Sequence, residues 1–174
     1  VYDFGQNMSG IVHLKVTGPE GYRVRIIPAE LLNEDHTPDQ RATGQPYYWE
    51  YTLKGKGAED WQPLFSYYGF RYAGVEVLDT AGAIVDLSAV KIDSLIALHT
   101  QNAAPTAGTF ACSSPLFNKI FKLIWWGISN NMSNVATDCP HREKLGWLEE
   151  THLIGTSMQY NYDILRFYNK IIDD

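Results

Sequence analysis

Apolar and polar residues alternate along the first part of the chain with a period of two, which is typical of β-strands. The alternation is clearest in runs bounded by Gly, Pro or Asn, at residues 11–16, 22–27, 47–53, 70–78 and 90–98. Turn-forming residues follow the first run and the third, so we expect hairpins at residues 18–21 and 55–57. Several short strands without intervening helices indicate an antiparallel β-sandwich or jelly roll.

The period changes near residue 111. Ser113-Ser114-Pro115 is typical of a helix start, and the apolar residues that follow recur at helical spacing. This pattern predicts a helix over residues 115–130. Residues 132–146 contain many polar residues and few apolar ones, so they are predicted to form a loop. A second helical stretch is predicted from Trp147 onward, with or without a break.

The pattern therefore predicts an α+β chain in two parts, residues 1–111 and 112–174. The chain begins without Met, in a pattern typical of the middle of a strand, and stops just after a helix-like run, so we expect it to be a truncated segment. So few helices leave apolar faces without neighbours. We expect these faces to be covered by the sandwich or by a second copy of the chain, or the helices to be partly disordered.

Composition narrows the classes of function. A chain of 174 residues with 45% hydrophobic and 20% charged residues is typical of a folded globular protein. The net charge of −6 and the lack of a Lys/Arg stripe argue against nucleic acid as a partner. No apolar run is long enough to span a membrane, and the two Cys residues show no metal-binding spacing. No cofactor or metal is therefore expected.

The densest polar cluster lies at residues 137–150, where four carboxylates, two cations, a His and a Trp occur together. Cleavage of a glycosidic bond needs a carboxylic acid, an opposing carboxylate and an aromatic wall for the sugar. Asp138 and Glu143 flank a Pro, Arg142 could hold a hydroxyl or steady a carboxylate, and Trp147 could stack on a ring. The alternative is a solvated polar connection between two helices, which composition alone favours.

A family resemblance changes this balance. Residues 138–147, Asp-Cys-Pro-x-Arg-Glu-Lys-Leu-Gly-Trp, resemble the signature of family 78 glycoside hydrolases, the α-L-rhamnosidases. Asp-Phe-Gly-Gln-Asn at residues 3–7 and Gly-Phe-Arg-Tyr at residues 69–72 resemble the β-sandwich that precedes their catalytic domain. The resemblance implies a jelly-roll-like sandwich over residues 1–111, followed by the first helices of a truncated (α/α)6 barrel over residues 112–174.

The resemblance also implies roles for individual residues. The acid four positions before Trp147 is the family's general acid, which is Glu143 here. The residues implied to bind substrate are Asp138, His141, Arg142, Trp147 and Glu150. Two departures bear on this assignment: the acidic run is one residue shorter than a common form of the motif, and Glu149-Glu150 stands where Gly-Asp is usual.

The implied reaction is inverting, exo-acting hydrolysis of terminal α-L-rhamnosyl bonds, with a rhamnose-containing carbohydrate as partner and a second carboxylate activating water. In the family that base lies beyond the position of Asp174, so the chain alone is expected to be inactive. Cys139 is interpreted as structural rather than nucleophilic. Localisation stays open, with a periplasmic or secreted location favoured over a cytoplasmic one.

Two other functions stay open. One is a non-catalytic carbohydrate-binding or interaction module, in which the sandwich binds glycan and the helices merely pack. A positioned acid at Glu143 argues against it. The other is a related hydrolase of the same barrel class that acts on another sugar, which the sequence does not exclude.

Overall fold

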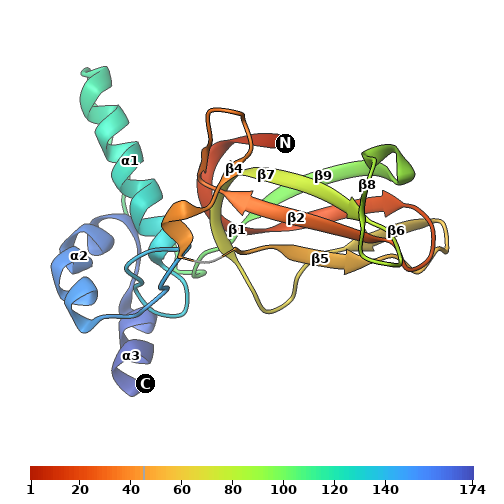
Figure 1. Ribbon diagram of the computed structural model, residues 1–174. Coiled ribbons are helices and arrows are strands. Elements are labelled where there is room, and N and C mark those ends of the chain that lie inside the picture. The colour runs from red at the N-terminus through yellow and green to blue at the C-terminus, as the bar shows by residue number, and fades with distance from the viewer. Residues whose placement is uncertain (45) are drawn as a thin grey trace. The chain divides into compact units, whose positions relative to one another are not determined.

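The computed structural model describes residues 1–44 and 46–174, and the chain forms two compact units, Val1–His99 and Thr100–Asp174. The first unit is built from strands and the second from helices (Figure 1). The predicted α+β class is therefore confirmed. Residues 100–111, which the sequence pattern assigned to the first part, belong to the helical unit in this division.

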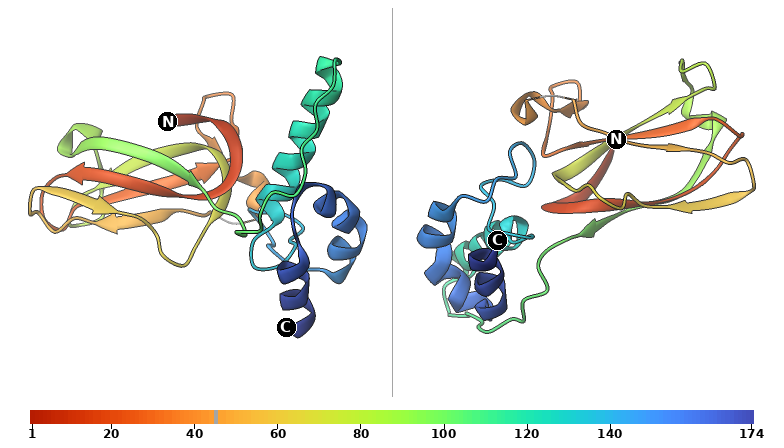
Figure 2. Two further views of the ribbon diagram at one scale, coloured as in Figure 1. Left: turned by 180° about the vertical axis from the view of Figure 1, so that it is seen from behind. Right: turned by 90° about the horizontal axis from the view of Figure 1, so that it is seen from below.

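One curled antiparallel sheet forms the first unit (Figure 2). Its path runs β5-β2-β7-β1-β6, with β8 paired to β7 and β9 paired to β1, while β3 and β4 form a separate small hairpin. Two short 3-10 helices lie at Arg41–Thr43 and Leu87–Ala89. The strands are β1 (Tyr2–Thr17), β2 (Arg23–Ala29), β3 (Leu31–Leu32), β4 (Pro38–Asp39), β5 (Trp49–Thr52), β6 (Ala58–Trp61), β7 (Tyr68–Leu78), β8 (Ile84–Val85) and β9 (Lys91–His99).

The long strand β1 takes part in both layers of this curled sheet. Its first half pairs with β7, and its second half pairs with β6 and β9. The register with β7 shifts between Asp3 and Met8, and Gly5 has a φ of 78° within this irregular stretch. A bulge of this kind bends a strand and increases its twist, so β1 can pass from one layer to the other.

Alternation along the strands produces the core between the layers. Val12, Leu14 and Val16 of β1 are fully buried, whereas His13 and Lys15 between them are not. The buried cluster also takes side chains from β2, β5, β7 and β9. Phe70 lies in it with no exposed surface and packs edge-on against Phe4 at 5.7 Å between ring centroids. This arrangement is the sandwich that the period-two pattern predicts.

The two expected hairpins are wrong. The turn at residues 18–21 joins β1 to β2, but β2 pairs with β5 and β7. The turn at residues 55–57 joins β5 to β6, but β6 pairs with β1. Each turn therefore leads the chain to a strand that pairs elsewhere in the sheet.

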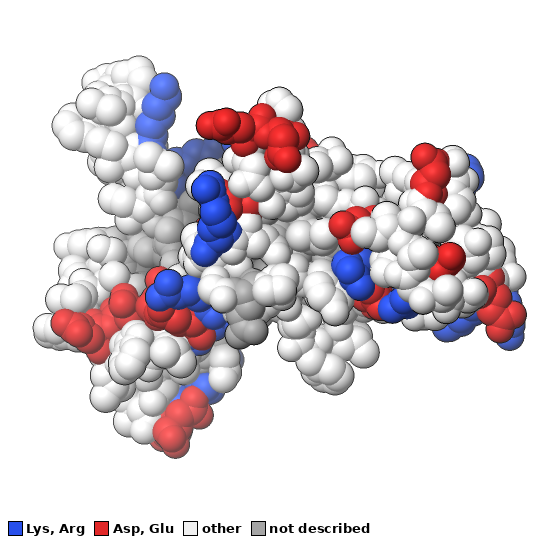
Figure 3. Space-filling model, viewed as in Figure 1, with Lys and Arg blue, Asp and Glu red and all other residues white. Residues whose placement is uncertain are grey.

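Ion pairs between strands link the outer face of β2 to its neighbours. Arg25 lies 2.9 Å from Glu50 of β5 and 3.6 Å from Glu76 of β7. Acidic and basic side chains are interspersed on the visible face of this unit (Figure 3). An ion pair between β1 and β7 joins the motifs at residues 3–7 and 69–72. Arg71 donates to both carboxylate oxygens of Asp3 at 2.8 Å, which lowers the pKa of Asp3 to about 2.

Three helices form the second unit: α1 (Pro115–Asn131), α2 (Leu148–Asn161) and α3 (Leu165–Asp173). The predicted first helix is confirmed to within one residue, and the second helical stretch does break, between α2 and α3. Their shared core contains residues from α1, α2, α3 and the segments between them: Ile128, Met132, Ala136, Met158, Tyr162, Ile164 and Phe167. Within the described ranges, no helix has the length and apolar character that crossing a membrane requires.

Candidate active site

The polar cluster lies on a loop between α1 and α2, which we call the acid loop (residues 132–147). Its first part is fastened to the end of α1, because the Thr137 amide donates to the carbonyl of Asn131 at 2.8 Å. Its last part passes close to Val135. A Cβ at Gly146 would lie only 2.4 Å from a methyl carbon of Val135, so the close approach requires glycine.

Asp138 closes the acid loop. Its amide donates to the carbonyl of Leu145 at 3.0 Å, and its Oδ1 accepts the amides of Leu145 at 3.0 Å and of Cys139 at 2.7 Å. The chain returns to Asp138 because Lys144 adopts a left-handed conformation, with a φ of 56°. The Oδ2 atom accepts the indole N–H of Trp147 at 3.3 Å.

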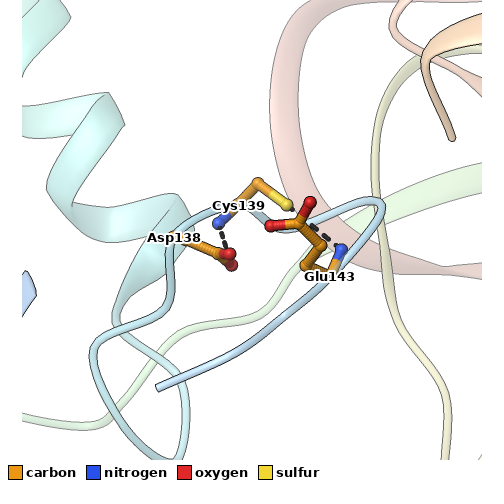
Figure 4. Close-up of side chains that lie close together, drawn as sticks. All are labelled: Asp138, Cys139 and Glu143. Carbon is orange, nitrogen blue, oxygen red and sulfur yellow. Dashed lines mark hydrogen bonds between the residues drawn. The ribbon is translucent and has the colours of Figure 1, made fainter. Parts of the chain in front are cut away.

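Glu143 lies beside Asp138 (Figure 4). A carboxylate oxygen of each residue and the Cys139 sulfur all lie within 4.8 Å of one another. The Glu143 amide donates to the Cys139 sulfur at 3.3 Å, which fits the structural role expected of that thiol. Arg142 donates from Nε to the Glu143 carboxylate at 2.9 Å. The structure thus brings together Asp138, Arg142, Glu143 and Trp147.

The surroundings of the acid loop shift the pKa values of three of its ionisable groups. Burial raises the pKa of Asp138, but hydrogen bonds from Glu143, from the amides of Leu145 and Cys139 and from the indole outweigh it, so the net pKa is lowered. The hydrogen bond to Glu143 raises the pKa of the Arg142 guanidinium. Burial lowers the pKa of Lys144. Asp138 is therefore held in its anionic form.

The other predicted site residues lie at the edges of this group. Trp147 directly precedes α2 and is 55% exposed, so a face of its ring is open to solvent. Glu150 follows one turn later and is half-buried, and its carboxylate makes no hydrogen bond to the group among the described residues. His141 is half-buried in the turn that begins at Pro140.

Sequence reasoning missed Lys144 and Leu145, which position the others through their backbone. A left-handed φ at a lysine leaves no sequence signal beyond its place in the motif.

Asp138, Cys139 and Glu143 offer three possible metal-ligand atoms close together. All three residues already bond within the acid loop, and exposed acids of this kind occur commonly without an ion, so we assign no metal.

The arrangement can protonate an oxygen held against the indole. Glu143 would donate the proton, Asp138 would remain anionic, Arg142 would steady the acid, and the exposed face of Trp147 would pack on an apolar ring face. Two carboxyl groups are what most glycoside hydrolases use to cleave a glycosidic bond.

Comparison with known proteins identifies the family. Residues 1–96 match the bacterial alpha-L-rhamnosidase concanavalin-like domain, and residues 105–174 match the bacterial alpha-L-rhamnosidase 6 hairpin glycosidase domain. The chain therefore belongs to the bacterial α-L-rhamnosidase family. The resemblance to family 78 is confirmed.

Individual relatives agree over nearly the whole chain. An alpha-L-rhamnosidase of Formosa agariphila is 38% identical over 100% of this chain and 18% of its own length. The structure of alpha-L-rhamnosidase from Dictyoglumus thermophilum superposes with a TM-score of 0.83 at 36% identity, covering 99% of this chain and 19% of that one. The Streptomyces avermitilis alpha-L-rhamnosidase complexed with L-rhamnose gives a TM-score of 0.76 at 34% identity, covering 97% and 16%. The chain thus spans about a fifth of the length of these relatives.

Proposed function

We propose that the intact protein containing this chain is an exo-acting, inverting α-L-rhamnosidase that hydrolyses terminal α-L-rhamnosyl bonds, with Glu143 as its general acid. The observation that carries this proposal is the Asp138–Glu143 carboxyl pair beside the exposed ring of Trp147. Hydrolysis of a glycoside needs a proton at the departing oxygen, and we assign its delivery to Glu143 because the lowered pKa of Asp138 keeps Asp138 anionic.

Rhamnose suits the remaining side chains of the acid loop. A deoxy sugar has a methyl group and an apolar ring face that can pack on Trp147, while its hydroxyls need charged partners. Arg142 is half exposed and can reach such a hydroxyl while it holds Glu143. We assign His141 and Glu150 as further sugar contacts at the edge of the site. The L-rhamnose bound to the Streptomyces avermitilis relative supports this ligand.

The general base requires a carboxylate that the acid loop does not supply. In inverting enzymes the two carboxyl groups stand roughly 6.5–9.5 Å apart, which leaves room for water. Asp138 lies within 4.8 Å of Glu143 and is already bonded to the acid loop, so it is too close to serve. We propose that the base comes from the four fifths of the relatives' length that this chain does not cover, and that the chain alone is inactive.

The test is Glu143→Gln in the intact protein, which keeps the shape of the side chain but removes its proton. Turnover on rhamnosides with poor leaving groups should fall by about 10²–10⁴-fold, the usual contribution of general acid catalysis. Nitrophenyl rhamnosides need less protonation of the leaving group and should lose less.

Glu149→Gln is the matched control, because Glu149 is an exposed carboxylate at the start of α2. It should leave turnover on both substrates within about twofold, as is usual for a surface position. An equal loss on both substrates in Glu143→Gln would contradict the acid role and point to binding or structure instead.

For the chain on its own we propose self-association through the helices. Leu116 and Leu123 of α1 are 63% and 72% exposed, and Ile172 of α3 is 80% exposed. Exposed apolar side chains in such numbers favour association in water. Light scattering should give a mass above that of one chain, and Leu123→Lys should shift the mass toward the monomer. A monomer at micromolar concentration without this substitution would contradict the proposal.

A further inference from the structure

Asp138 is bonded from several directions at once. Its Oδ1 atom accepts two backbone amides, Cys139 at 2.7 Å and Leu145 at 3.0 Å, which lie at opposite ends of the turn that carries Glu143. Its Oδ2 atom accepts the indole N–H of Trp147 at 3.3 Å. The carboxylate that faces the acid therefore also fastens the turn beneath the acid and the ring beside it.

We propose that Asp138 is the positioning residue of this site: it sets the plane of the Trp147 indole and holds Glu143 at its place on the turn. The inference rests on the proposed function for the identity of the acid and deepens it. It differs from a role in which Asp138 only touches the sugar, because the bonds that carry it run to groups of the protein itself.

The first reason is the weak support of Trp147 elsewhere. Trp147 is 55% exposed, and although it is the N-cap residue of α2, its side chain makes no hydrogen bond to the start of that helix. An exposed aromatic side chain rotates among several rotamers unless a specific bond selects one. The indole N–H to Oδ2 bond provides that selection, so the ring is already placed when a sugar arrives.

The second reason is electrostatic. The titratable groups beside Glu143 are Asp138 and Cys139, which lie within 4.8 Å of it, and Arg142, which donates to its carboxylate. Asp138 is the anion among them and disfavours a second negative charge on its neighbour. Removing its charge while keeping its volume should therefore remove this repulsion.

The experiment uses Asp138→Asn in the intact protein. The amide oxygen of Asn can still accept the amides of Cys139 and Leu145, so the turn can persist. Its NH₂ group cannot accept the indole N–H of Trp147. Three measurements follow: the ¹⁹F spectrum of fluorotryptophan-labelled protein without sugar, the split between kcat and KM, and the pH profile of kcat/KM. The Trp147 resonance is assigned by its loss in Trp147→Phe.

We expect the Trp147 resonance of Asp138→Asn to shift or broaden without sugar. We expect kcat to fall by about 10²-fold with a smaller change in KM, since misplacement of a catalytic group by an ångström has that effect. The basic limb of the pH profile should move to lower pH. Asp163→Asn is the matched control, because Asp163 accepts the Leu165 amide at the start of α3 at 3.3 Å, away from the acid loop. It should change none of the three measurements.

An unchanged Trp147 resonance with a raised KM would overturn the proposal and leave Asp138 as a sugar contact only. Failure of the proposed function has a separate signature, which is a basic limb that persists in Glu143→Gln. In that case the ¹⁹F measurement still decides whether Asp138 positions Trp147. Loss of the folded signal in all Trp resonances of Asp138→Asn would assign the residue a general structural role and also overturn the proposal.

Discussion

Substitution of Gly146 by Ala should destabilise the helical unit, and the structure sets the size of the effect. The new Cβ would lie 2.4 Å from Cγ2 and 3.0 Å from Cβ of Val135. Val135 is β-branched, so rotation of its side chain brings another methyl group or the Cβ itself into the same space. Overpacking of this kind costs about 1–3 kcal/mol. The strain falls on the end of the acid loop that bonds to Asp138.

Urea unfolding of this chain, followed by circular dichroism at a helical wavelength, measures the change in the free energy of unfolding. Gly127→Ala is the control, since a Cβ there meets nothing within 4 Å and lies inside α1. It should stabilise by about 0.5–1 kcal/mol. The second substitution Val135→Ala should recover most of the loss in Gly146→Ala. The reasoning is refuted if Gly146→Ala is neutral, or if the double variant is no more stable than the sum of the single effects predicts.

Two further predictions concern the sandwich. Phe70→Ala should lower the free energy of unfolding of the sandwich by about 3–5 kcal/mol, because the ring is fully buried. Phe65→Ala should change it by less than about 0.5 kcal/mol, because Phe65 is 100% exposed. Urea titration followed by tryptophan fluorescence compares the two variants. Burial raises the pKa of Glu59, but the amides of Lys54 and Gly55 and the Tyr51 hydroxyl lower it further. The stabilising effect of the Glu59 carboxylate is therefore present above pH 4.5, its ordinary pKa, and is lost as the pH falls through the lowered pKa. Glu59→Gln should be less stable than the unchanged chain near neutral pH, and its free energy of unfolding should fall less in acid. Parallel curves of stability against pH for the two proteins would contradict this.

The spacing of apolar residues predicts the strands and helices of this fold better than it predicts which strands pair. The alternation around Val12 and Leu14 shows which side chains are buried, because successive side chains of a strand point to opposite faces of the sheet. The partners of β1 are distant in the sequence, and no local signal at residues 18–21 shows that the next strand, β2, pairs elsewhere in the sheet. Strand pairing depends on which faces remain to be covered once all strands are present.

The site shows the same division between local and distant causes. The spacing of Asp138, Glu143 and Trp147 on one short loop is enough to predict that they can meet. The bonds of Asp138 to Leu145 and to the indole depend on the left-handed conformation of Lys144, which residue type does not predict. Glu150 lies on α2, whose direction is set by packing, so its predicted place in the group stays a prediction.

The pairing of β1 also bears on synthesis of the protein. Thr17 pairs with Lys91 and Gly10 pairs with His99, so during translation β1 waits for the last strand of its unit. At about 5–20 residues per second, the roughly 80 residues between them take on the order of ten seconds to translate. The apolar side of β1 has no complete cover during that interval, which makes it a substrate for chaperones. Slow codons placed just before β9 should lower the soluble yield more than the same codons placed after residue 130.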